Sequence, residues 1–136
     1  MLSKYFLLAG CMAMMSLGAI GCGTTVLYAP TNAPVRPMRA RQPETVRVFS
    51  SGIPNVPYIE VGLLEARQSS SFSVDHMPEI IEEMRARAAE IGCDGVWITS
   101  RADKTSVYAD PHHVHVGTRE GFMAACIQFV GPSAVQ

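Results

Sequence analysis

Three histidines close together in the chain have the spacing that comes nearest to a metal site. His112, His113 and His115 lie in the long segment 101–121. On a strand, side chains two positions apart point the same way, so the imidazoles of His113 and His115 could together bind Zn²⁺ or Cu²⁺. A structural zinc site normally takes four ligands, and His76 could join only if the fold brings it close. We therefore interpret the segment as an exposed polar loop with a histidine-rich tip, and keep metal binding as the alternative.

Cys93 and Cys126 are the two cysteines within the predicted globular region. A disulfide between them requires Cα atoms within about 7 Å, although Cys126 lies nearer Val96 than Cys93 if the last two predicted strands form a hairpin. The alternative is two buried reduced thiols, because free cysteine packs as a small hydrophobic side chain. Neither cysteine has a basic cluster near it in the sequence, so we do not expect a reactive thiol.

The sequence carries no motif typical of an enzyme. A phosphate-binding loop, a nucleophile elbow, HExxH, C-x-x-C and a dinucleotide fingerprint are all missing from it. The serines at 69–71 and 73 have no base near them in the sequence. We therefore expect a non-enzymatic protein without a cofactor.

A single small α+β domain at 45–130 must position these side chains. The apolar and β-branched runs predict strands at 46–49, 58–66, 95–100 and 122–130. The order β-β-α-β-β places one helix on one face of a small mixed sheet, and the strand–helix–strand unit predicts a parallel pair with a right-handed crossover. The opposite face, with Trp97 and Phe49, would be exposed or covered by a partner.

The helix between the second and third predicted strands has the strongest local signals. Asp75 is its expected N-cap and Gly92 its expected C-terminal glycine. Its apolar side chains recur at helical spacing and form one stripe, Met77, Ile80, Ile81, Met84, Ala88 and Ile91. We expect Ile81 and Met84 to pack against the sheet.

The N-terminus predicts export. Residues 5–20 contain no charge and follow a start with one lysine, which is typical of a secretory signal peptide over 1–21. Ala19-Ile20-Gly21-Cys22 resembles the lipobox of bacterial lipoproteins, so we expect acylation at Cys22 and anchoring in membrane lipid. Cys11 is a second candidate, but only about five apolar residues precede it. An uncleaved anchor helix and plain secretion are the remaining alternatives.

The segment after Cys22 reads as a spacer, and the overall charge is weak. The spacer, 22–44, contains four prolines and three arginines, Pro30, Pro34, Pro37, Pro43, Arg36, Arg39 and Arg41. Proline favours extended polyproline II, so we expect a semi-rigid tether that spans roughly 60–70 Å. A short tail follows at 131–136. The formal net charge of -1 over 136 residues gives no field that favours nucleic acid.

Two family resemblances accompany these features. The segment 85–96, RARAAEIGCDGV, resembles the helix-to-strand junction of small bacterial domains, some of which are assigned to heavy-metal binding. A larger part of the chain is similar to the outer-membrane lipoprotein sensor of the Rcs phosphorelay, through the segment 46–49, Gly62, the helix and the segment 125–127 in that order. The proline-rich segment after a lipidated cysteine is shared with that family as well.

The second resemblance implies a non-enzymatic envelope protein that reports stress through protein contacts. It also implies two disulfides, whereas only Cys93 and Cys126 remain here after loss of the leader, and only Cys126 falls on a family cysteine. Gly23 after Cys22 resembles an outer-membrane address. We therefore expect an outer-membrane-anchored interaction or stress-sensor lipoprotein, with its domain in the periplasm or at the cell surface. A periplasmic metal-binding lipoprotein that uses the histidine-rich segment is the alternative.

Overall fold

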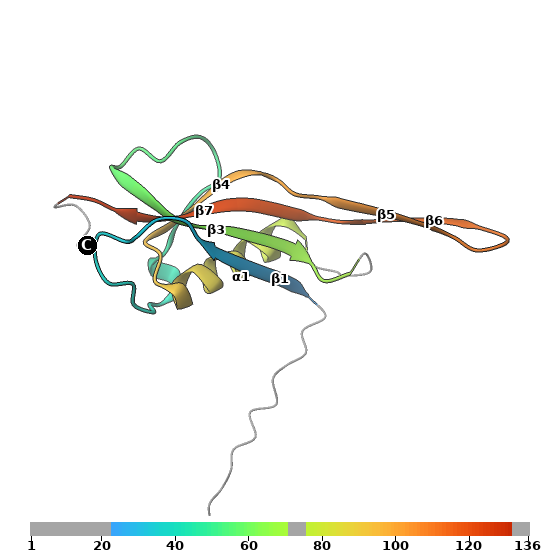
Figure 1. The fold of residues 1–136 in the computed structure, drawn as a ribbon, viewed down its shortest axis with the longest axis horizontal. Helices are drawn as coiled ribbons and strands as arrows, with labels where there is room; N and C mark the ends of the chain where they lie inside the picture. The colour runs from blue at the N-terminus through green and yellow to red at the C-terminus, as the bar shows by residue number, and fades with distance from the viewer. Residues whose placement is uncertain (1–22, 71–75, 132–136) are drawn as a thin grey trace, which may run out of the picture.

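The computed structural model describes residues 23–70 and 76–131 (Figure 1). The predicted signal peptide, the expected acylation site Cys22, the expected N-cap Asp75 and residues 132–136 of the tail lie outside these residues. Among the described residues, no helix has both the length and the apolar character needed to cross a bilayer.

A five-stranded sheet forms the body of the protein, with one helix on one face. Its strands follow the order β1-β3-β7-β4-β2. The strand bounds are β1 Thr24–Pro30, β2 Arg47–Phe49, β3 Tyr58–Gln68, β4 Gly95–Arg101 and β7 Gly121–Phe129. The helix α1 covers Met77–Ile91, and a 3-10 turn, η1, covers Pro43–Thr45 before β2. The α+β class, with one helix packed on a mixed sheet, is confirmed.

The strands on either side of α1 run in the same direction but are not neighbours. β3 and β4 are each antiparallel to β7, which lies between them, so β3 and β4 are parallel to one another. The parallel pair joined by hydrogen bonds is β2 with β4 instead. β7 can occupy the centre because every residue along it is buried or half-buried, as an apolar strand with both faces covered requires.

The helix packs through a face slightly rotated from the predicted one. Ile80, Met84 and Ala88 are fully buried and share the core with Ala89. Ile81 is only half-buried, which corrects its expected place against the sheet, while Met84 packs there as predicted. The helix ends at Gly92, whose φ of 102° is the left-handed conformation that favours glycine at this position.

Residues 24–42 are part of the fold, which corrects the prediction of an extended tether. β1 pairs with β3 from Thr24–Gln68 to Pro30–Gly62, and Val26 and Tyr28 pack against the core while their neighbours face solvent. A Cβ on Gly62 would collide with the Tyr28 ring. Gly62 therefore allows the close approach that its place in a strand predicts, beside a register shift between Glu60 and Gly62.

Residues 101–121 form a long hairpin, which corrects the prediction of a polar loop. β5 Lys104–Ala109 and β6 Val114–Arg119 make a separate two-stranded sheet, which we call the arm. It projects from one end of the body, and its tip lies far from the helix (Figure 1). A four-residue turn with the sequence Asp-Pro-His-His joins the strands, and the Asp110 N–H donates to the carbonyl of His113 at 2.9 Å.

Candidate functional site

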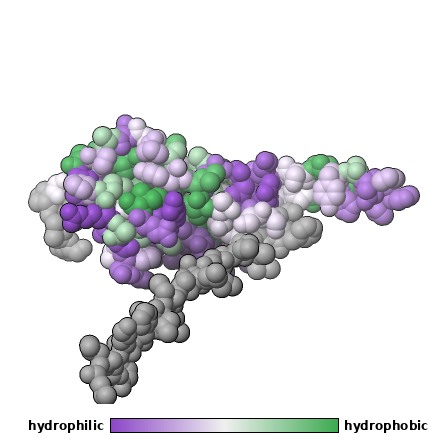
Figure 2. Space-filling view, turned by 60° about the horizontal axis from the view of Figure 1, so that its bottom comes forward, coloured by the Kyte–Doolittle hydropathy of each residue, from purple (hydrophilic) through white to green (hydrophobic). Residues whose placement is uncertain are grey.

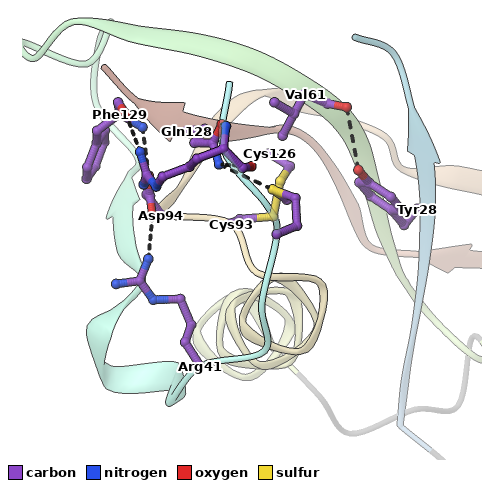
Figure 3. Close-up of a disulfide and its surroundings, with 10 residues drawn as sticks. Tyr28, Arg41, Val61, Cys93, Asp94, Cys126, Gln128 and Phe129 are labelled. Carbon is purple, nitrogen blue, oxygen red and sulfur yellow. Dashed lines mark hydrogen bonds and ion pairs between the residues drawn. A yellow bond between two sulfur atoms is a disulfide. The ribbon is translucent and has the colours of Figure 1, made fainter. Parts of the chain in front are cut away.

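A buried disulfide lies where the helix ends and the central strands meet (Figure 3). Cys93 and Cys126 are bonded, with Cα atoms 5.6 Å apart, and neither is exposed. Cys126 is paired with Val96 in the sheet, as the predicted register requires. Cys93 still reaches it because the left-handed turn at Gly92 directs the chain from the helix towards β4.

Residues 31–42, which we call the strap, connect the two edge strands and pass the disulfide and the end of α1 (Figure 3). The side chain of Gln128, 1% exposed, holds the strap. Its amide oxygen accepts the Val35 N–H at 2.8 Å, and its amide nitrogen donates to the Arg36 carbonyl at 3.0 Å. Further along, the Arg41 N–H donates to the Ala89 carbonyl at 2.9 Å.

One carboxylate gathers the charges of the strap. Asp94 is 8% exposed in its side chain and forms ion pairs with Arg36 and Arg41. The Phe129 N–H also donates to it at 2.8 Å. A buried carboxylate needs such compensation, because an unpaired buried charge costs several kcal/mol. The two arginines therefore fix the strap to the end of the sheet.

A depression of about 460 Å³ lies over this cluster, lined by Arg36, Pro37, Arg39, Ala40, Arg41, Gly92, Asp94 and Gln128. Two of its three arginines are already paired with Asp94. Its polar groups mainly bond one another, so the arrangement serves to hold the strap in place. The sequence signals that could have revealed it are the aspartate after Cys93 and the glutamine within the apolar last strand.

The predicted histidine site lies at the tip of the arm. The Asp110 carboxylate accepts the N–H groups of His112 and His113, each at 2.8 Å. Its other oxygen lies 3.1 Å from Nε2 of His115, whose ring stacks on Tyr108 with centroids 4.8 Å apart. The His112 N–H and the His115 side chain hold the pKa of Asp110 below its usual range.

These contacts organise the turn, with the His113 and His115 rings 6.1 Å apart. Within residues 23–70 and 76–131, no group of three or more His, Cys, Asp and Glu side chains is arranged to hold a metal ion. His76, the possible further ligand, precedes α1 as its N-cap, where its N–H donates to the Glu79 carboxylate at 3.1 Å.

The arm has one apolar face. Val107 pairs with Val116 and Ala109 with Val114, and side chains of these two pairs share a side of the hairpin. Val107, Val114 and Val116 are 63%, 68% and 67% exposed. Figure 2 shows this hydrophobic surface partway along the arm, before the hydrophilic tip.

The face of the sheet opposite the helix carries both covered and open apolar groups. Trp97 and Phe49, expected to be exposed or covered by a partner, are half-buried in edge-on contacts with Tyr58 and Phe129. Leu27 and Leu63 nearer β1 remain exposed. They line a shallow groove of about 430 Å³ together with Tyr28, Ala29, Glu65 and Met123.

No family model matches the chain, and no curated protein matches it. The virulence factor FvfA of Francisella, in its orthorhombic crystal structure, is similar at 15% sequence identity, over 75% of this chain and 96% of that one. Its TM-score of 0.44 is too low to support an argument about function.

Proposed function

We propose that this protein is a non-enzymatic lipoprotein of the bacterial outer membrane, anchored through acylated Cys22. The protein acts by contact with another envelope protein. Stress sensing is the form of this function that the resemblance in the sequence implies. The observation that carries the proposal is the position of the fold directly after Cys22. β1 starts at Thr24, and the Gly23 carbonyl accepts the Ser69 N–H at 2.7 Å.

An acyl anchor at Cys22 would hold the domain at the bilayer surface, since consecutive Cα atoms are only about 3.8 Å apart. The disulfide between Cys93 and Cys126 supports the export that this anchor requires, because disulfides persist outside the reducing cytoplasm. The domain would then face its partners from a fixed end, with β1 and the end of β3 closest to the lipid.

The open face of the sheet supports a protein partner. Exposed apolar surface is often a contact site, and Leu27 and Leu63 line the groove beside β1. A partner with a matching apolar segment would cover these side chains. The charged outer face of α1, with Glu83 exposed, offers a contrasting surface on the same protein.

Two measurements test the proposal. Metabolic labelling with a fatty acid should acylate the wild type and not Cys22→Ala, whereas loss of labelling only in Cys11→Ala would refute the site. A photocrosslinking residue at Leu63 should capture a discrete envelope protein in intact cells, and the same residue at Glu83 should not. Equal crosslinking from both positions, or none from Leu63, would contradict contact through the open face.

A further inference from the structure

We propose that the arm is a second membrane contact, which lays its valine face on the bilayer that holds the acyl chains of Cys22. This inference rests on the proposed lipid anchor. It adds to that anchor an orientation, because two separated contacts fix how the domain stands on the membrane.

The anchored end and the base of the arm lie together. Gly23 is bonded to Ser69 through its carbonyl, and the Ser69 carbonyl accepts from the Arg119 guanidinium at 3.4 Å. Arg119 is the last residue of β6. Because Cys22 is adjacent to Gly23, its acyl chains would enter the bilayer beside the residues from which the arm extends.

The sheet topology gives the same placement. Thr24 at the start of β1 is opposite Gln68 at the end of β3, and Arg67 is opposite Gly121 at the start of β7. β7 follows the arm directly in the chain. The arm therefore leaves the body at the end where the predicted anchor lies, and extends away from the body there (Figure 1).

The base of the arm is fixed to the body. The Asp103 carboxylate accepts the Gly121 N–H at 3.0 Å and is bonded to the Arg101 guanidinium. The Glu120 N–H donates to the side chain of Gln68 at 2.9 Å. A Cβ on Gly121 would come within 2.8 Å of the Ala102 carbonyl oxygen, so the two chain segments meet closely. These contacts hold the direction of the arm relative to the anchor.

The valine face has the chemistry of a lipid contact. Val107, Val114 and Val116 are each more than 60% exposed, which leaves a row of aliphatic groups without cover in the described part of the chain. Each strand of the arm has six residues and spans about 20 Å, so the valine face can lie along the boundary between headgroups and acyl chains. We assign the valine face to lipid because the predicted anchor lies at the base of the arm.

The test places an environment-sensitive fluorophore on either face of the arm in the full acylated protein. Val116→Cys carries it on the valine face, and Ser106→Cys carries it on the opposite face. Cys22 is acylated in the proposed form and Cys93 is bonded to Cys126, so the introduced thiol is the one that reacts. The labelled proteins are reconstituted in vesicles of phosphatidylethanolamine and phosphatidylglycerol that contain lipids brominated along their acyl chains.

We expect bromine to quench the label at position 116 several-fold more strongly than the label at position 106. Equal quenching, with both proteins floating with the vesicles, overturns the inference and leaves the lipid anchor standing. Loss of flotation in both proteins overturns the anchor and the inference with it. If the label at position 116 is protected from water in native outer membranes but is not quenched by bromine in protein-free vesicles, a protein covers the valine face. That outcome also overturns the inference.

Discussion

Reducing the Cys93–Cys126 disulfide should lower the free energy of unfolding by an amount that the size of its loop predicts. The bond joins residues separated by 33 positions. In the chain-entropy description, closing a loop of this size removes about 12.5 cal/mol/K from the unfolded chain, or about 3.7 kcal/mol at 25 °C. Because both cysteines are fully buried, the two sulfurs of the reduced protein must move apart within the close-packed core, which adds to this loss.

Urea unfolding followed by the fluorescence of Trp97 measures this difference between oxidised and reduced protein. With a slope of about 1–3 kcal/mol/M, the midpoint should fall by roughly 1–4 M on reduction. The double variant Cys93→Ala/Cys126→Ala should be at least as unstable as the reduced wild type, since it also loses two buried sulfurs. Its stability should not change when reductant is added. Labelling of two free thiols in denatured, unreduced protein, or a midpoint shift below about 0.3 M, would refute the reasoning.

Three further outcomes are expected. Ile80→Ala should lower the free energy of unfolding, measured in urea, by about 2–5 kcal/mol because Ile80 is fully buried. Ile81→Ala should lower it clearly less because Ile81 is half-buried, and equal losses for the two variants would contradict the observed helix face. The Gly121 N–H, and more weakly Arg101, holds the pKa of Asp103 below its ordinary value of 3.8. The carboxylate therefore contributes its full stabilisation above pH 3.8, and this contribution is lost as the pH falls through the lower pKa of the folded protein. Asp103→Asn should flatten this acid dependence of the free energy of unfolding, and an unchanged dependence would refute the assignment. Calorimetry should detect no sub-micromolar binding of Zn²⁺ or Cu²⁺; tight binding that weakens below about pH 6 and disappears in the double variant His113→Ala/His115→Ala would instead favour the metal-binding alternative.

The helix and four of the strands were predictable because their signals are local. Gly92 ends α1 through its own backbone freedom, and apolar runs mark β2, β3, β4 and β7 within one residue or two of their observed ends. Such signals depend on neighbours in the chain, so periodicity suffices to detect them. The face of α1 was less certain, because Ile80 and Ile81 are adjacent and both apolar, and only the sheet decides which is buried.

The arm was missed although part of its signal is local. Asp110-Pro111 is typical of a turn, and Val107, Val114 and Val116 alternate with polar residues on its two sides. Pro111, Gly117 and the absence of a continuous apolar run favour a loop in the sequence, whereas the structure shows a hairpin whose tip is held by Asp110.

The amino-acid sequence by itself determined the class of fold, the helix and the central strands, and it predicts export and a lipid anchor. The path of residues 24–42 was decided only by the tertiary structure. Arg36 and Arg41 meet Asp94 across 58 and 53 positions in the sequence, and Gln128 bonds the strap across more than 90. A stretch rich in proline and arginine has no residues within itself that could pair with its arginines, so its sequence indicates a spacer. Its binding partners are a buried carboxylate, a buried amide and the edge of β3, and only the folded body brings these to it.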